Sequence, residues 1–138
     1  EGGIPCVFYT DVYGANYEDD GKQVELIGVK ELHEMLHTRK NIAYGEQKDY
    51  LDHANCIGWT RAGDEEHPNS GIAVLMSTGD EGFKEMEISP EFAGKRFVDV
   101  LGNRPEEVVI DENGKGAFFC NGGSVSVWIM KDVNEAMN

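Results

Sequence analysis

The sequence has few basic residues. Lys and Arg together number 12, against 26 Asp and Glu, which gives a formal net charge of −14 over 138 residues. A surface that binds nucleic acid needs clustered Lys and Arg to contact phosphates, so the composition argues against a nucleic-acid partner. Carboxylates are the ligands that calcium prefers, but acidity alone does not define a calcium site.

Cysteines and long apolar runs are also scarce. The three cysteines, Cys6, Cys56 and Cys120, are odd in number and widely spaced. They do not form a disulfide framework, and they favour a reducing compartment and therefore a cytoplasmic location. No apolar run approaches the length of about 20 residues that crosses a bilayer, so we expect no membrane partner.

The first third of the chain combines a strand pattern with a helix pattern. Residues 4–9 form a short apolar run, typical of a strand buried on both faces, and residues 14–23 are a polar loop. Apolar residues then recur at spacings of three and four, which predicts an amphipathic helix from Val24 to Lys40. A strand followed by a helix is half of a βαβ unit, and that unit needs a parallel neighbour.

The rest of the chain is rich in short strand patterns. They recur every ~8–12 residues, which predicts an antiparallel sandwich or barrel. Asn113-Gly114 predicts a hairpin between two of them, and the polar residues 131–138 predict a flexible tail. The predicted strands are 49–52, 56–61, 71–77, 83–88, 96–100, 107–111, 116–120 and 124–130.

One short motif matches a metal site. "HEMLH" places His33 and His37 one helical turn apart with Glu34 between them, as in zinc peptidases, where the histidines bind the metal and the Glu activates water. Both histidines flank the apolar stripe of the predicted helix, and no third ligand stands at a recognisable spacing. We therefore interpret them as residues at the edge of a packed face and keep the zinc peptidase as an alternative.

Other candidate chemistry is unspecific. The cysteines lie in or beside apolar runs and are interpreted as buried small hydrophobes. Paired carboxylates can cut a glycosidic bond, but 26 acidic residues select no pair. Trp59 and Trp128 suit either sugar stacking or a core. Taken residue by residue, the sequence indicates an acidic β-rich domain preceded by one strand and one helix.

Longer motifs carry a resemblance to a known family. "GIPCVFYTDVYG", "AYGEQKDYLDH", "IGWTRAGD" and "NGGSVSVW" resemble the C-terminal part of bacterial α-amylases of the liquefying and cytoplasmic type, which are retaining glycoside hydrolases. The resemblance implies a mainly β fold, the Greek-key β-sandwich called domain C, preceded by one strand and one helix of a (β/α)8 barrel. Residues 1–41 would be the barrel remnant, 42–130 the all-β domain and 131–138 the flexible tail.

The resemblance also implies where the chemistry lies. The family hydrolyses internal α-1,4-glucosidic bonds of starch, glycogen and maltodextrins, and its three catalytic carboxylates stand upstream of the region matched here. We therefore expect a fragment with no catalytic residue, inactive alone and structural in role, whose partner is the missing barrel. Asp11 and Tyr13, in the loop after the eighth barrel strand, would line the glucan cleft of the intact enzyme. A carbohydrate-binding module built on Trp59 or Trp128 is the alternative.

Four positions that depart from the family pattern concern the turn and the metal. Thr10 replaces the usual glycine at the strand end. Several relatives hold a calcium ion between barrel and domain C, with a His-Asp pair and a later Asp as ligands. The matching positions are Ala54, Asn55 and Thr78, so we expect calcium only in the missing part of the parent enzyme and no metal in this chain. We also expect the unpaired first strand to be disordered or to pair with another copy of the chain, which would cause self-association.

Overall fold

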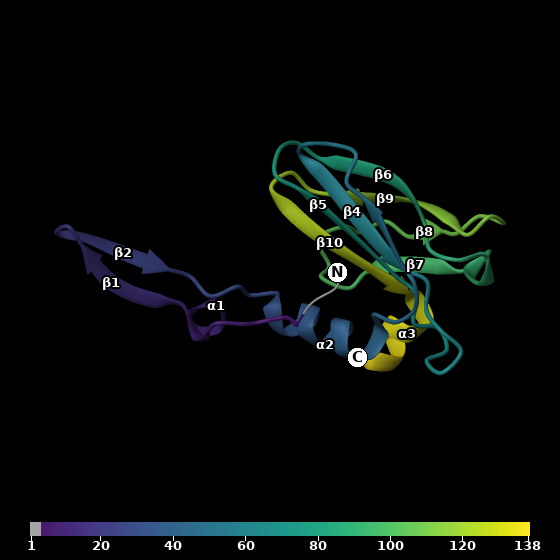
Figure 1. The fold of residues 1–138 in the computed structure, drawn as a ribbon, viewed down its shortest axis with the longest axis horizontal. Helices are drawn as coiled ribbons and strands as arrows, with labels where there is room; N and C mark the ends of the chain where they lie inside the picture. The colour runs from purple at the N-terminus through teal and green to yellow at the C-terminus, as the bar shows by residue number, and fades with distance from the viewer. Residues whose placement is uncertain (1–3) are drawn as a thin grey trace.

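The computed structural model describes residues 4–138, which form ten strands, three α-helices and a short 3-10 helix η1 (Figure 1). The chain order is α1 (Tyr9–Tyr13), β1 (Ala15–Asp19), β2 (Lys22–Leu26), α2 (Leu32–Ile42), β3 (Gln47–Tyr50), β4 (Cys56–Arg61), β5 (Ile72–Ser77), β6 (Gly82–Glu87), η1 (Pro90–Phe92), β7 (Arg96–Asp99), β8 (Val108–Val109), β9 (Lys115–Cys120), β10 (Ser124–Met130) and α3 (Lys131–Met137).

Two antiparallel sheets make the body of the molecule. The larger sheet has the order β3-β4-β5-β10-β7-β8, and β6 pairs with β9 in a second sheet. The chain crosses from β5 to β6 in the second sheet, returns to the larger sheet for β7 and β8, crosses again to β9, and ends in β10, which lies between β5 and β7. This arrangement confirms the predicted mainly β sandwich.

The core lies between the two sheets. Phe118 from β9 and Met86 from β6 pack there against Leu75, Phe97 and Trp128 of the larger sheet, and all five side chains are fully buried. In β9, buried residues alternate with more exposed ones, because one face meets the core and the other meets solvent. The central strands β5 and β10 are buried almost throughout, which follows from their being covered on both faces.

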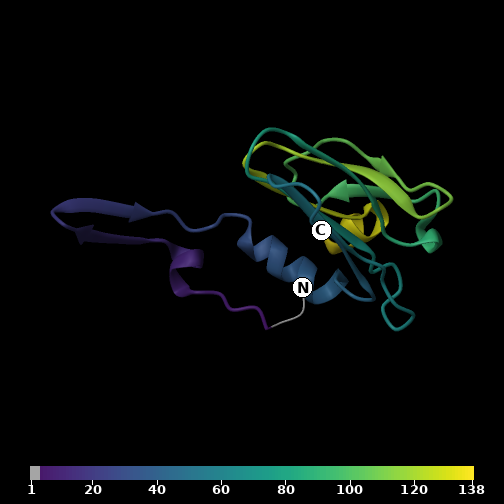
Figure 2. The same ribbon diagram turned by 45° about the horizontal axis from the view of Figure 1, so that its top comes forward.

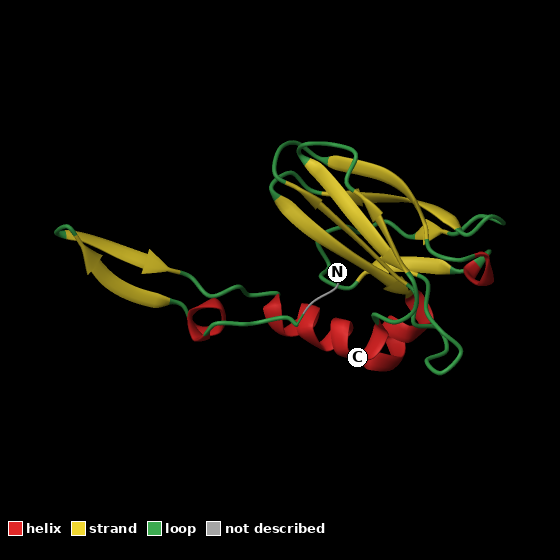
Figure 3. Ribbon diagram, in the orientation of Figure 1, coloured by secondary structure: helices red, strands yellow, loops and turns green. Residues whose placement is uncertain are grey.

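Helices α2 and α3 cover the outer face of the larger sheet (Figures 1 and 3). A second apolar cluster forms there around buried residues of α2, β5 and β10, with Met35 of α2 and Val133 and Met137 of α3 packed against it. Residues 131–137 are therefore helical, where the sequence predicts a flexible tail. The prediction rested on the polar composition of this segment. It overlooked Val133 and Met137, two apolar residues spaced one helical turn apart.

The first third of the chain differs from its prediction. Residues 4–8 form no strand, and the expected loop at 14–23 is the hairpin of β1 and β2. Its turn, Asp20-Gly21, has φ of 49° and 73°, both positive as a tight two-residue turn requires. The predicted helix Val24–Lys40 begins only at Leu32 and ends at Ile42. Residues 1–3 of the expected barrel remnant lie outside the described residues.

These differences have a physical cause. A parallel barrel strand needs neighbours to receive its backbone hydrogen bonds, and none of the described residues pairs with 4–8. Val24 and Leu26 fit a helical period but pair in β2 with Tyr17 and Ala15. Gly28 follows, a residue that disfavours continuing a helix.

The Asn113-Gly114 signal marks a turn but not the expected hairpin. The backbone N–H of Gly114 donates to the carbonyl oxygen of Asp111 at 3.1 Å, and the Asp111 carboxylate accepts from the N–H of Asn113 and of Lys115. The strands on either side pair elsewhere, however: β8 pairs with β7 and β9 pairs with β6.

Candidate functional site

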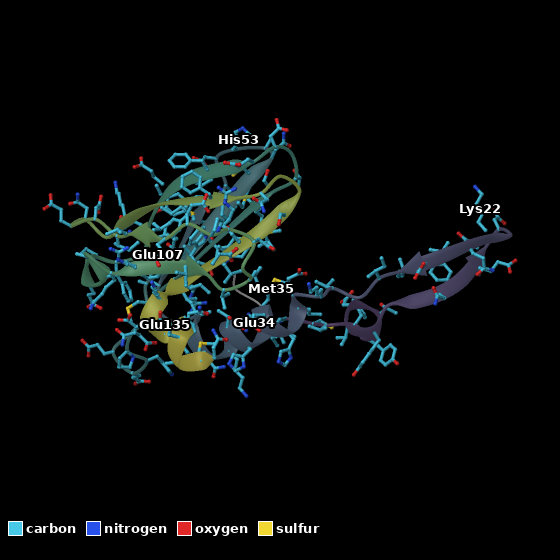
Figure 4. All side chains as sticks on the ribbon, turned by 180° about the vertical axis from the view of Figure 1, so that it is seen from behind. Lys22, Glu34, Met35, His53, Glu107 and Glu135 are labelled. Carbon is cyan, nitrogen blue, oxygen red and sulfur yellow. The ribbon has the colours of Figure 1, made fainter. Side chains whose placement is uncertain are left out.

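Residues 4–31, called the arm from here on, begin beside α2 and carry α1 and the β1–β2 hairpin away from the sandwich (Figures 1 and 2). Lys22, at the hairpin tip, is far from every other labelled residue in Figure 4. No residue between 4 and 31 is buried. Ten of the fifteen exposed large hydrophobics among the described residues lie in the arm: Ile4, Val7, Phe8, Tyr9, Val12, Tyr13, Tyr17, Leu26, Ile27 and Val29.

The predicted site residues Asp11 and Tyr13 lie together on α1, at the base of the hairpin. The carboxylate of Asp11 accepts a hydrogen bond from the backbone N–H of Phe8 at 3.0 Å, which holds the first turn of α1. Tyr13 is 72% exposed, and its ring stands 4.6 Å from that of Tyr9, centroid to centroid. The two residues therefore differ: Asp11 shapes the turn, and Tyr13 presents an aromatic surface.

Backbone contacts fix α1 against the segment that follows the hairpin. The N–H of Val29 donates to the carbonyl oxygen of Asp11 at 2.7 Å. A Cβ added at Gly28 would stand 2.4 Å from the carbonyl oxygen of Val12, so only glycine permits this approach. Gly14, with φ of 69°, approaches the carbonyl oxygen of Leu26 in the same way. The arm is thus shaped by its own backbone while its apolar side chains face solvent.

The histidines of "HEMLH" do not form a metal site with other residues of the described chain. His33 and His37 are exposed on α2, whereas Met35 between them packs against the sheet. Among residues 4–138, no group of three or more His, Cys, Asp or Glu side chains is placed to hold a metal ion. The zinc-peptidase alternative therefore gains no support.

The positions that match the interface calcium ligands do come together, but with unsuitable side chains. The backbone N–H of Thr78 donates to the carbonyl oxygen of Asn55 at 2.9 Å, so the two positions are neighbours. Ala54, Asn55 and Thr78 supply no carboxylate and no imidazole. Because calcium in proteins is held largely by carboxylates, these residues do not fit the ion.

The tryptophans are placed for packing. Trp128 is fully buried, and its indole N–H donates to the hydroxyl oxygen of Ser126 at 2.8 Å. Trp59 packs against the outer apolar cluster. It also lines a cavity of about 560 Å³ between α2 and the larger sheet, together with Met35 and Val127. Trp128 is excluded as a sugar platform, and Trp59 faces a groove beneath α2.

Sequence reasoning missed the apolar residues after the hairpin. Ile27 is 85% exposed and Val29 is 46% exposed. Both lie within the predicted helix Val24–Lys40, in which the spacing of Val29 from Leu26 placed Val29 on the apolar stripe. The available signal was the unpaired apolar run at residues 4–9, which already showed that this part of the chain lacks a partner within the sequence.

Comparisons with known proteins find relatives among the α-amylases. The family model described as alpha-amylase C-terminal matches residues 77–129. By sequence, this chain is similar to bacterial α-amylases. It is 46% identical to a cytoplasmic alpha-amylase of Escherichia coli over 96% of its length and 46% identical to an alpha-amylase of Geobacillus stearothermophilus over 92%. It is also 44% identical to a glucan 1,4-alpha-maltohexaosidase of a Bacillus species over 95% of its length.

The chain spans about a quarter of these amylases, covering 28%, 22% and 24% of their lengths. Among solved structures, an α-amylase from Malbranchea cinnamomea matches with a TM-score of 0.47 and 11% identity, over 72% of this chain and 20% of that chain. Among residues 4–138, no helix combines the length and the apolar character that crossing a membrane requires.

Proposed function

We propose that this chain is the C-terminal region of a retaining α-amylase that cleaves internal α-1,4-glucosidic bonds in starch, glycogen or maltodextrins. The main observation behind this proposal is the arm. It exposes ten large hydrophobic side chains on a segment whose conformation is held by its own backbone hydrogen bonds. Exposed apolar surface of this extent marks a contact with another protein surface. In the proposal, residues 1–41 complete a (β/α)8 barrel and residues 42–130 form domain C, which caps that barrel.

The chain alone is inactive in this proposal, because the catalytic carboxylates belong to the barrel. Its contribution to catalysis is positional. Asp11 keeps the turn of α1, and Tyr13 presents its ring to the glucan cleft once the barrel surrounds the arm. Active sites of such barrels form from several loops at one face, so neither residue makes a site by itself.

The proposal also covers the calcium site and the cellular location of the enzyme. The amylase would hold calcium in its barrel, because Ala54, Asn55 and Thr78 do not fit the ion. Its location would be cytoplasmic, which is supported by the name of the Escherichia coli relative and by the three free cysteines.

A chimera tests the proposed function. The matching quarter of the Escherichia coli cytoplasmic alpha-amylase is replaced by this chain, and starch clearing is scored in native gels stained with iodine. We expect the chimera to clear starch and this chain alone to leave it intact. A version carrying Phe8→Ser and Ile27→Ser should lose activity, whereas Phe83→Ser, at an exposed residue of the sandwich, should keep it. Clearing by this chain alone, or a folded chimera without activity, would contradict the proposal.

The same gel distinguishes the carbohydrate-binding alternative. A module that binds sugar migrates more slowly in starch than in a starch-free gel, without clearing. Our proposal predicts that this chain migrates equally in both gels, because the glucan cleft is complete only when the barrel is present.

The isolated chain is also expected to self-associate. Both strands of the β1–β2 hairpin leave one edge unpaired, and the apolar residues of the arm lie around it. Sedimentation should show dimers or larger species at high concentration, and removal of residues 4–31 should return the chain to a monomer. A monomer at every concentration would contradict the expectation.

A further inference from the structure

Two of the three cysteines meet in the core of the sandwich. Cys56 opens β4 in the larger sheet, and Cys120 closes β9 in the second sheet, so they lie on opposite layers of the same apolar cluster. Both are free thiols, with exposed fractions of 8% and 0%. Cys56 follows His53 by three residues, and Figure 4 shows His53 at one end of the sandwich.

Gly82 brings the two sulfur atoms together. It is the partner of Cys120 in the β6–β9 register, and a Cβ added to it would stand 2.8 Å from the Sγ of Cys120 and 2.8 Å from the Sγ of Cys56. The two sulfurs are therefore no more than twice that distance apart, 5.6 Å. An S–S bond is about 2.0 Å long, and rotation about both Cα–Cβ bonds together can bring the two sulfurs across the remaining gap.

We propose that Cys56 and Cys120 are a reversible modification site, a dithiol that closes to a disulfide between the two sheets. The oxidant is a peroxide or a diffusible low-molecular-weight disulfide. With hydrogen peroxide, one thiol becomes a sulfenic acid and releases water. The second sulfur then displaces hydroxide from it, which leaves as a second water, and the S–S bond forms. The two thiols lose two electrons and two protons, and the peroxide gains them. A small thiol reverses the step.

The surroundings keep the pair reduced until such an oxidant arrives. Burial, the largest cause, raises the pKa of the Cys120 thiol, and the neighbouring Cys56 adds to the shift. A thiol is a weak nucleophile compared with its thiolate, so the pair is stable in a reducing compartment. Oxidation should accelerate as the pH rises, because the thiolate fraction increases.

The bond would join layers that now meet only through side chains and loops. A cross-link of this kind stabilises mainly by restricting the unfolded chain, and the loop from Cys56 to Cys120 encloses most of the sandwich. We expect the oxidised chain to melt roughly 5–15 °C above the reduced chain.

The test uses the chain with Cys6→Ser, because exposed Cys6 would otherwise link two copies. The protein is treated with hydrogen peroxide, unfolded, alkylated and digested. We expect a peptide that joins Cys56 to Cys120, a mass lower by two hydrogen atoms, a higher melting temperature, and full reversal by dithiothreitol. Two alkylated thiols after the treatment, or oxygen adducts on either cysteine in place of the linked peptide, would overturn the proposal.

Substitutions at two glycines, Gly82 and Gly79, test whether formation of the disulfide depends on the space between the sulfurs. Gly82→Ala puts a methyl group between the sulfurs and should slow formation of the linked peptide. Gly79→Ala, near the same end, meets only Asn55 at 3.6 Å and should not. The melting temperatures of the two reduced variants show whether each still folds. Equal rates in two folded variants would contradict the geometry.

Discussion

The arm and the sandwich use apolar residues in opposite ways. In the sandwich, Trp128, Phe97 and Phe118 are fully buried between two sheets. In the arm, Phe8 and Tyr13 are 68% and 72% exposed. Both regions nevertheless have regular backbone structure, since the arm contains α1 and the β1–β2 hairpin.

The comparison separates two sources of order. The sandwich is stabilised by burial of apolar surface, which is the dominant favourable contribution to folding. The arm is shaped by local hydrogen bonds and by glycines at close approaches, which are individually weak. A short hairpin without a covered face is marginal in water, so the arm should depend on a partner that the sandwich does not need.

The largest expected effect comes from the core. Trp128→Ala should lower the free energy of unfolding by about 3–5 kcal/mol, because it leaves a cavity at the centre of the sandwich. Tyr13→Ala should change it by less than about 0.5 kcal/mol, as is usual for exposed positions. Urea unfolding followed by far-ultraviolet circular dichroism measures both. Similar losses in the two variants would show that the arm shares the stability of the sandwich.

The next effect concerns a buried carboxylate. Asp99 accepts hydrogen bonds from the backbone N–H groups of Leu101, Asn103, Arg104 and Val127, at 2.9–3.1 Å. Burial raises the pKa of Asp99, and these four bonds oppose that shift.

Asp99→Asn replaces one acceptor oxygen by an NH2 group that faces N–H donors. We expect a loss of about 2–3 kcal/mol in the free energy of unfolding. Asp19→Asn, at an exposed position of β1, should have no measurable effect in the same urea titration. If Asp99→Asn lowers the free energy of unfolding by no more than Asp19→Asn does, the turn after β7 does not depend on the carboxylate.

The sequence predicted the sandwich better than the arm, and the reason is physical. The strands predicted at 56–61 and 124–130 find their hydrogen-bond partners within this chain, and their apolar side chains are buried in it. The local sequence pattern and the structure therefore agree there. Residues 4–9 have the pattern of a buried strand without the neighbours, and Val24 and Leu26 fit two periods at once. Of the candidate site, the choice of Asp11 and Tyr13 followed from the resemblance, which implies a loop, whereas the structure places both residues on α1. The closeness of Cys56 and Cys120 depends on how two sheets stack, which spacing along the chain does not encode.

A smaller, local effect is expected within the arm. Gly28→Ala pushes against the carbonyl oxygen of Val12 and should break the hydrogen bond from the N–H of Val29 to Asp11. Amide exchange at Val29 should accelerate, while the urea midpoint of the sandwich stays unchanged. Gln23→Ala, at an exposed position of β2, serves as the control. A lower urea midpoint for Gly28→Ala would show that the stability of the sandwich depends on the arm.

The smallest effect concerns the attachment of α3 to the sandwich, and it depends on pH. Lys131 of α3, first, and Arg96 of β7, second, lower the pKa of Glu107 below its ordinary value of 4.5. A carboxyl group whose pKa is lowered on folding stabilises the fold above its unfolded pKa, and that contribution is lost as the pH falls through the folded value. Glu107→Gln should therefore lower the melting temperature slightly at neutral pH, and the difference from the unsubstituted chain should vanish between roughly pH 5 and pH 3. Glu112→Gln, at an exposed turn, should show no such dependence. Because α3 also packs through Val133 and Met137, the helix should remain docked in acid; unfolding of α3 alone at low pH would mean that the ion pairs, and not the apolar contacts, hold it to the sheet.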